Sequence, residues 1–343
     1  MRNLRAAALL AAAVLPAACA TAPDGPGPAK TPAVARDGVL GRSPHVLVAR
    51  LGPGDTPASL ARRYLGDESL AWRVSGVGGR TPQPGEAAAI ALKPDEASPV
   101  APARHVPILC YHRFTAGASH GRMEVSAAQL DAQLKWLKSD GWTVISLAAL
   151  AEFMDGRGSL PPKSIAITVD DGYRSAFEVA APIFKSYAVP ATFFVYPDFI
   201  GAGEAMSWAQ LDELQKTRIF AVQPHSKTHT DMAKRRSAES QKSYADRVRM
   251  ELEGSSESLS KHLKADQEVF AYPFGATNTQ VLEGARRAGY KMAVTVARGG
   301  NSAWSPPLLL RRDMIFGDDS METFARRVRA SAGGQTGGTE SEG

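Results

Sequence analysis

Cysteine is scarce in this chain of 343 residues, which contains only Cys19 and Cys110. One intrachain disulfide at most can form, and none is expected if Cys19 is acylated or removed with an N-terminal leader. The chain also lacks a dense lysine and arginine tract with interleaved aromatic residues, and its formal net charge is only +5. These absences exclude a disulfide-rich scaffold and give no sign of nucleic-acid binding.

A hydrophobic run long enough to span a membrane as a mature helix is absent as well. The apolar run over residues 6–15 is short, follows two arginines and precedes small residues. This pattern predicts a secretory signal over residues 1–20 and a protein exported to the cell envelope. Cys19 follows LPAA, which resembles a bacterial lipobox with its Leu one position early. Two interpretations stay open: a lipid anchor to the membrane at Cys19, or ordinary cleavage after residue 20.

Stretches rich in Pro, Gly and Ala divide the remaining sequence. Residues 21–44 and 95–104 have this composition and are predicted to be linkers. The tail over residues 331–343 has almost nothing to bury and is predicted to be disordered. Two folded units are therefore expected, over residues 45–94 and 105–330.

The first unit is predicted to fold in a β-α-α-β order. A strand is expected near Val46, and Asp55 or Thr56 can cap the helix that follows. A second helix is expected over residues 69–74 and a second strand over 88–92. The segments GDTPASLARRY and PGEAAAIAL resemble a LysM module, which implies binding to glycans that contain N-acetylglucosamine. The usual Asn after the second helix is missing, so a spacer without sugar affinity stays open.

From residue 105 onward, short apolar segments alternate with amphipathic ones. Strands are predicted over residues 106–112, 142–146, 164–171, 191–196, 218–223, 268–273 and 291–296, and helices over 130–139, 147–154, 175–187, 207–215, 247–263 and 278–288. This rhythm predicts an α/β fold with a parallel sheet. About seven repeats favour a distorted (β/α) barrel, in which the chemistry lies at the carboxyl ends of the strands.

Two predicted strand ends carry groups that can bind a metal. Asp170 and Asp171 end an apolar strand, where two carboxylates are costly to bury without a cation or donors. Neighbours on a strand point to opposite sides, so one can bind a metal while the other faces a substrate. His225 and His229 directly follow another strand and would share a face if the turn is helical. The structural alternatives are a helix-capping Asp and two surface histidines.

The motifs TVDDGY, HSKTH and YPFG, in this order, are similar to those of the NodB-homology polysaccharide deacetylases. Flanking segments such as PILCYHRF and VPATFFVYPDFIG agree, and the resemblance covers residues 105–330. It implies that Asp171, His225 and His229 hold a divalent metal ion. Zn²⁺ is the first expectation, with Co²⁺, Ni²⁺ or Mn²⁺ as alternatives.

The same resemblance implies roles for other residues. Asp170 would be the catalytic base, and Ser226 would steady the histidine loop. The backbone N–H of Phe274, in YPFG, would help to hold the carbonyl oxygen of the acetamide. Together with the metal, these groups would hydrolyse an N-acetyl group to acetate and a free amino sugar.

Two departures from the family pattern concern the polar groups around the base. The Arg that often precedes the Pro of the third motif by two residues is replaced by Ala271. The Leu-x-His of the fifth motif is replaced by LLLRRDMI, which has no His. Arg311 or Arg312 could take the place of the missing Arg in space. His112, at the end of the first strand, is a candidate for the general acid or a substrate contact.

The sequence therefore predicts a metal-dependent hydrolase that deacetylates a cell-envelope polysaccharide containing N-acetylglucosamine. Peptidoglycan is the favoured substrate, and poly-N-acetylglucosamine or a chitin-like polymer is the next choice. One alternative is an O-acetyl esterase acting on another polysaccharide such as xylan. Another is a non-catalytic glycan-binding lipoprotein, against which the intact aspartate and histidine motifs argue.

Overall fold

The computed structural model describes residues 38–42, 46–76, 81–92, 105–155, 158–303, 305–333 and 336–339. The predicted signal peptide with Cys19 and the predicted linker over residues 95–104 lie outside the described residues. Within these ranges, no helix is both long and apolar enough to cross a membrane.

The N-terminal unit is a small antiparallel sheet with one α-helix. Its elements are β1 (Val39–Arg42), β2 (Val46–Arg50), α1 (Pro57–Leu65), the 3₁₀ helix η1 (Glu68–Arg73), β3 (Val74–Gly76) and β4 (Ala87–Ala91), and the strand order is β1-β2-β4-β3. Helix α1 begins at a capping box between Thr56 and Ser59. It buries Leu60 and Ala61 against the sheet. The predicted order is therefore present, but the second helix is a 3₁₀ helix and two strands are added.

Strand β1 lies within the range predicted to be a linker, residues 21–44, so that prediction is wrong for residues 39–42. The strand pairs antiparallel with β2, and the Arg50 N–H donates to the Gly38 carbonyl at 2.8 Å. Backbone pairing of this kind needs no long apolar run, which is why composition alone did not indicate it.

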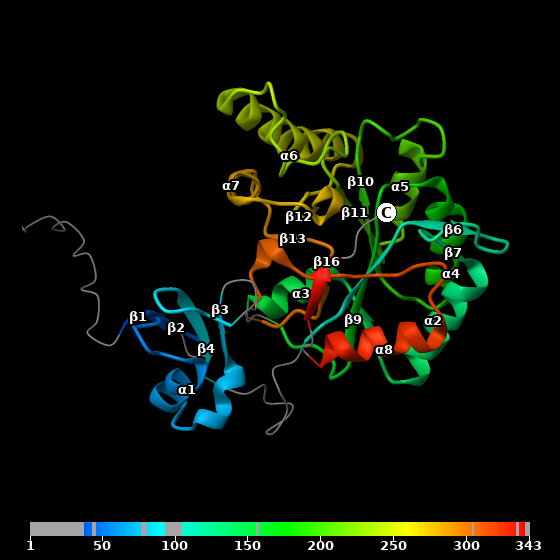
Figure 1. Cartoon of the computed structure of the whole chain (residues 1–343). Coiled ribbons are helices and arrows are strands. Elements are labelled where there is room, and N and C mark those ends of the chain that lie inside the picture. Colours follow the sequence, from blue (N-terminus) through cyan, green and yellow to red (C-terminus); the bar gives the residue numbers. More distant parts are fainter. Residues whose placement is uncertain are drawn as a thin grey trace, which may run out of the picture.

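The larger unit alternates strands and helices (Figure 1). Its main strands are β5 (Ile108–Tyr111), β8 (Thr143–Ile145), β9 (Ser164–Val169), β10 (Ala191–Val195), β11 (Phe220–Pro224), β12 (Val269–Ala271), β13 (Met292–Val294) and β15 (Asp313–Met314). Its α-helices are α2 (Ala127–Ser139), α3 (Leu147–Met154), α4 (Ala181–Ser186), α5 (Trp208–Lys216), α6 (Gln241–Leu263), α7 (Thr279–Arg287) and α8 (Met321–Ala332). The predicted helix over residues 175–187 is a π-helix, η3 (Ala176–Ala180), that continues into α4.

The main strands form a distorted parallel barrel, as the sequence predicts. The sheet β11-β10-β9-β5-β15 is parallel throughout, and β8 pairs with the first half of β9. The side chain of Gln223 bridges β11 to β12 by accepting from the N–H groups of Glu268 and Val269 at 3.0 and 2.9 Å. Strand β13 pairs with β12, and Val294 bridges to Leu310 just before β15. The ring therefore closes through β12 and β13.

The central barrel strands β9 and β10 are buried on both faces. Every residue of β9 and β10 is buried, which is typical of parallel strands covered on both sides. Residues of β9, β10, α2, α4 and α8 share the largest apolar cluster, and a second cluster joins α3 to β12 and β13. This packing leaves the strand ends as the places where polar side chains gather.

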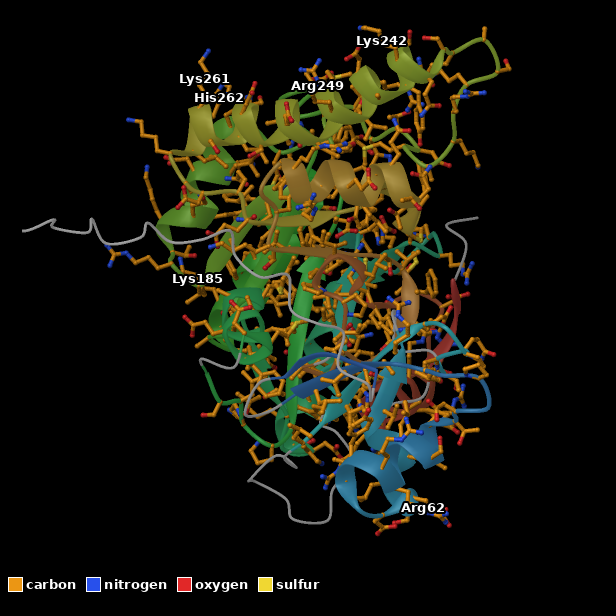
Figure 2. All side chains as sticks on the ribbon, turned by 90° about the vertical axis from the view of Figure 1, so that its left-hand side faces the viewer. Arg62, Lys185, Lys242, Arg249, Lys261 and His262 are labelled. Carbon is orange, nitrogen blue, oxygen red and sulfur yellow. The ribbon has the colours of Figure 1, made fainter. Side chains whose placement is uncertain are left out.

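Helix α6 is longer than predicted. Its first turns are polar, so they carry no hydrophobic signal in the sequence. It begins at Gln241, after the Ser240 side chain accepts from the Ser243 N–H, rather than at Arg247. Val248 and Leu252 pack in a cluster with α7. Figure 2 shows charged side chains projecting from the other face, including those of Lys242, Arg249 and Lys261. An amphipathic helix therefore covers β12 and the loop that follows β11.

The C-terminal tail is more ordered than predicted. Helix α8 runs to Ala332, and β16 (Thr336–Thr339) pairs antiparallel with β14 (Ala297–Gly299). Both lie partly or wholly within residues 331–343, where disorder was predicted. Low hydrophobicity was a poor guide here, because a strand can add to an exposed edge through its backbone alone.

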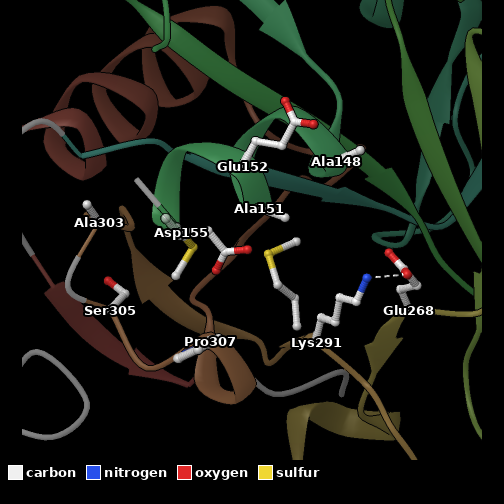
Figure 3. Close-up of a pocket in the computed structure, with 11 residues that line it drawn as sticks. Ala148, Ala151, Glu152, Asp155, Glu268, Lys291, Ala303, Ser305 and Pro307 are labelled. Atoms are coloured by element: carbon white, nitrogen blue, oxygen red, sulfur yellow. Dashed lines mark hydrogen bonds and ion pairs between the residues drawn. The ribbon is translucent and has the colours of Figure 1, made fainter. Parts of the chain in front are cut away.

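A pocket of about 360 Å³ opens at the amino ends of the strands (Figure 3). Ala151 and Met154 of α3 line it, together with an ion pair between Lys291 and Glu268. Glu268 and Lys291 directly precede β12 and β13. The pocket therefore lies at the opposite end of the barrel from the carboxyl strand ends, where the sequence predicts the chemistry.

Candidate metal centre

The carboxyl end of β9 turns sharply between two carboxylates. Asp170 is buried, whereas Asp171 and Gly172 have φ values of +74° and +84°. The left-handed conformation is uncommon for a residue other than Gly, Asn or Asp. At Gly172, a Cβ atom would also come within 3.0 Å of the Val195 side chain. This turn directs the two neighbouring carboxylates to different partners.

Asp171 meets the two predicted histidines. Its Oδ1 atom lies 3.5 Å from Nε2 of His225 and 3.2 Å from Nε2 of His229. All three atoms are buried and have no hydrogen-bond partner among the described residues. One carboxylate and two imidazoles, converging with unsatisfied lone pairs, are the donor set of many catalytic metal sites. The residues therefore fit a divalent cation.

The histidine segment is a loop, not the helical turn considered from its spacing. Ser226 and His229 have φ values of +63° and +60°, and the Ser226 hydroxyl accepts from the His229 N–H at 2.9 Å. Nδ1 of His225 lies 2.8 Å from the Ala271 carbonyl. Because a carbonyl only accepts, Nδ1 carries the proton and Nε2 keeps its lone pair. The loop thus aims both imidazoles at Asp171.

Glu251, on α6, is a residue of this site that the sequence reasoning missed. It is 1% exposed. Its carboxylate accepts from the backbone N–H groups of Lys227 and Thr228, both at 2.9 Å, and from the Thr228 hydroxyl at 2.7 Å. A glutamate on the buried face of an amphipathic helix, beside Leu252, was the signal that could have found it. The carboxylate ties the histidine loop to α6.

Asp170 is held by Arg312. From the sequence, Arg311 and Arg312 are the two candidates to replace the family arginine that is Ala271 in this chain. The two terminal nitrogens of Arg312 donate to Oδ1 and Oδ2 of Asp170 at 2.7 and 2.6 Å. Arg312 also donates to the Thr168 hydroxyl and the Thr295 carbonyl at 3.0 and 2.9 Å. Arg311 instead donates to the carbonyl of Arg298. The bidentate pair is fully buried.

Both carboxylates are ionised at neutral pH despite their burial. Burial would raise the pKa of Asp170, but the charge and the hydrogen bonds of Arg312 outweigh it and leave that pKa below its usual range. Burial would likewise raise the pKa of Asp171, but the imidazoles of His225 and His229 hold it well below its usual range. Asp170 can therefore accept a proton, and Asp171 can offer an anionic oxygen to a cation.

His112 lies beside Asp170. It is buried, and a ring nitrogen of His112, Sγ of Cys110 and a carboxylate oxygen of Asp170 lie within 4.8 Å of one another. Cys110 donates weakly to Asp170 at 3.5 Å, and its thiol is buried. Because Arg312 already engages both oxygens of Asp170, this second group is a poor metal site. It does place an imidazole next to the candidate base.

Phe274 lies next to His229. Its φ value is +58°, and its ring packs against the ring of His229 with centroids 4.9 Å apart. Its backbone N–H has no acceptor among the described residues. Next to it, a Cβ atom at Gly275 would approach the Val296 nitrogen to 2.5 Å. The YPFG segment therefore needs its glycine, and it presents an N–H beside the candidate metal ligands.

Comparisons with known proteins identify relatives of the barrel unit. The family model for polysaccharide deacetylases matches residues 157–293. Poly-beta-1,6-N-acetyl-D-glucosamine N-deacetylase of Staphylococcus aureus is 26% identical over 219 residues, which cover 62% of this chain and 75% of the relative.

Two solved structures have a similar fold. Deacetylase PplD of Streptococcus pyogenes, in complex with acetate, aligns with a TM-score of 0.59 and 26% identity over 66% of this chain and 99% of that chain. A polysaccharide deacetylase from Bacillus cereus aligns with a TM-score of 0.57 and 25% identity over 73% of each chain. Residues 157–293, within the barrel unit, therefore carry a polysaccharide deacetylase domain, which is a domain of hydrolytic enzymes.

Proposed function

We propose that this protein is a metal-dependent deacetylase that removes N-acetyl groups from a glucosamine-containing polysaccharide of the cell envelope. One observation carries the proposal. The two adjacent carboxylates have different partners: Asp171 lies against His225 and His229, and Asp170 is held by Arg312. A site with a metal ligand set and a distinct ionised base suits hydrolysis by an activated water.

Asp171, His225 and His229 would hold the metal, with Zn²⁺ as the first expectation. When bound, a divalent cation supplies a Lewis acid for the acetamide carbonyl and lowers the pKa of a water. Asp170 would accept the proton from that water. The Arg312 guanidinium would keep the carboxylate oriented, and the Phe274 N–H would donate to the oxygen that becomes negative.

The departing amine needs a proton, and His112 is our candidate donor. Its imidazole lies within the group formed with Asp170 and Cys110. Asp170, having accepted a proton from water, is the alternative donor at that stage of the reaction. An acetyl ester could be hydrolysed by the same groups, and it would need less help from an acid because an alkoxide is the better leaving group.

The proposed substrate is a polymer of N-acetylglucosamine. The Staphylococcus aureus relative is named for activity on the β-1,6-linked polymer, which favours that linkage over peptidoglycan, the substrate that the sequence alone put first. The LysM-like order of the first unit supports binding to the same sugar. The predicted leader over residues 1–20 supports export to the envelope, with a lipid anchor if Cys19 is acylated.

Acetate release tests this proposal. The purified protein would be incubated with β-1,6-linked poly-N-acetylglucosamine, peptidoglycan, chitin oligomers and acetylated xylan, with a chelator or with added Zn²⁺ or Co²⁺. We expect acetate from at least one amino-sugar polymer, only when metal is present. Release from xylan alone would make the protein an esterase.

Two variants separate catalysis from binding. Asp170→Asn should lower kcat by about 10²- to 10⁴-fold, the usual contribution of a general base, while metal binding is retained. Asp212→Asn, an exposed aspartate on α5, is the matched control and should keep full activity. Equal activity of wild type and Asp170→Asn would contradict the proposed site, and no acetate from any polymer would favour a glycan-binding protein.

A further inference from the structure

Arg312 lies on a short stretch of backbone, residues 310–312, which we call the arginine segment. The segment comes just before β15, so the strand ladder between β15 and β5 does not include it. The Leu310 carbonyl accepts from the Thr295 N–H at 2.8 Å, and the Arg312 N–H donates to the Ala297 carbonyl at 3.0 Å. These hydrogen bonds tie one edge of the segment to the end of β13 and the start of β14.

Asn301 holds the other edge of the arginine segment. Its side chain is fully buried, and its Oδ1 atom accepts from the Arg311 N–H at 2.8 Å. Its Nδ2 atom donates to the carbonyls of Arg311 and Val106 at 2.9 and 3.3 Å. Because the Arg311 N–H can only donate, the amide oxygen must face it. Both amide hydrogens and the amide oxygen of Asn301 are therefore engaged.

The amide of Asn301 takes the place of a ladder hydrogen bond. The Ile315 N–H donates to the Cys110 carbonyl at 2.9 Å, where β15 pairs with β5. Bonds on one side of a parallel strand recur every second residue, so the ladder, continued backwards, would set the Arg311 N–H against the Val106 carbonyl. Asn301 lies between these two groups and bonds to both. Its amide therefore extends the register of β5 and β15 to the arginine segment.

The register of this segment matters because it contains two adjacent arginines. Successive side chains of an extended chain point to opposite sides. The Arg312 side chain reaches Asp170, whereas the Arg311 side chain donates to the Arg298 carbonyl. A slip of one residue would exchange the two side chains. The backbone hydrogen bonds of the segment therefore decide which arginine meets the carboxylate of Asp170.

We propose that Asn301 is a positioning residue for the reaction, because it fixes the register that sets the Arg312 guanidinium against the Asp170 carboxylate. This inference rests on the proposed function, in which Asp170 is the base. Asn301 acts through the backbone of Arg311 and needs no contact with the substrate. A base displaced by about 1 Å can cost about 10²-fold in rate. The loss should therefore fall on kcat and spare the affinities for substrate and metal.

Replacement of the amide by a carboxylate tests this role. Asn301→Asp keeps the oxygen that faces the Arg311 N–H, but its second oxygen cannot donate to the two carbonyls. We expect kcat to fall by about 10- to 100-fold, with KM and metal affinity within about twofold of wild type. Gln267→Glu is the matched control, since Gln267 is a buried amide whose Nε2 donates to the Ala265 carbonyl. The control should keep kcat even if Tm falls, and Asn301→Ser is measured if Asn301→Asp does not fold.

A double variant separates positioning from a general loss of stability. In the Arg312→Lys background, Asn301→Asp should lower kcat by less than about twofold further, because the guanidinium that it positions is already gone. An additive loss of kcat in the double variant would overturn the proposal. So would an Asn301→Asp protein with wild-type kcat, or one whose metal affinity falls as much as its kcat.

Nuclear magnetic resonance tests the inference without turnover. The Arg312 Nε–H donates to the Thr295 carbonyl at 2.9 Å, and the absence of its signal from Arg312→Lys assigns it. Its exchange with D₂O should be at least about tenfold faster in Asn301→Asp and unchanged in Gln267→Glu. Unchanged exchange in Asn301→Asp would overturn the inference whatever the activity. Faster exchange would support the positioning of Arg312 even if wild type released no acetate, so the two failures can be told apart.

Discussion

Arg312 holds both oxygens of the Asp170 carboxylate, although 142 residues separate the two in the sequence. The pair is completely buried, so each charge depends on the other for its solvation. Arg312, just before β15, thus makes the contact expected of the family arginine that Ala271 replaces two residues before Pro273. The relationship explains how Asp170 stays ionised in a buried site.

Arg312→Lys should lower kcat strongly, because an ammonium group cannot reproduce the bidentate contact. Arg312→Ala leaves the Asp170 charge buried without its partner and should also lower the free energy of unfolding by about 3–5 kcal/mol. Acetate release and chemical denaturation measure the two effects. Arg311→Lys is the control, and it should leave both values close to wild type. Full activity of Arg312→Lys would show that orientation of the base is unimportant.

Glu251→Ala should weaken metal binding by about 10- to 100-fold, the usual cost of losing a partner that orients metal ligands. The loop N–H groups of Lys227 and Thr228 would lose their acceptor. Competition with a chromophoric chelator measures the affinity, and Co²⁺ spectra report the ligand geometry. Glu251→Gln, which keeps one acceptor oxygen, should recover part of the loss.

Ser255→Ala is the matched control for Glu251. Ser255 is also buried on α6, but its hydroxyl contacts the Leu252 carbonyl instead of the histidine loop. It should keep wild-type metal affinity even if thermal stability falls. If both variants lost affinity in proportion to stability, Glu251 would be a structural residue only.

His112→Ala should lower kcat on an N-acetylated sugar by about 10²-fold, the lower range for a general acid. An activated aryl acetate has a leaving group that needs no proton, so its hydrolysis should change little. The ratio of the two rates is the measurement. A parallel loss on both substrates would assign His112 to positioning of Asp170, and an unchanged amide rate would remove it from the mechanism.

Glu239, just before α6, forms an ion pair with Arg247 on that helix. This pair should make the stability of the protein depend on pH in the acidic range. The hydrogen bond from Arg247 lowers the pKa of Glu239 from 4.5 to about 2. The contribution of this pair to the free energy of unfolding is therefore complete above pH 4.5 and is lost as the pH falls towards 2. Glu239→Gln should lower Tm at pH 6 and flatten its pH dependence below 4.5. Parallel curves for the two proteins would contradict the assignment.

Much of the barrel was predictable because each element carries a local signal. The buried strands β9 and β10 are continuous apolar runs, and α3 begins and ends at the predicted residues. The signal was weaker where polar backbone pairing decides the structure. Strands β1 and β16, and the first turns of α6, have no apolar pattern and were not predicted.

The sequence by itself determined the kinds of groups in the site and the strands after which they lie. Adjacent Asp170 and Asp171 and the His225 and His229 pair are local patterns, and parallel strands bring their carboxyl ends together. Only the tertiary structure decided which arginine reaches Asp170, that the histidine segment is a loop, and that Glu251 supports it. Those contacts join segments far apart in the chain, and a buried charge takes whichever distant partner the packing brings within hydrogen-bonding distance.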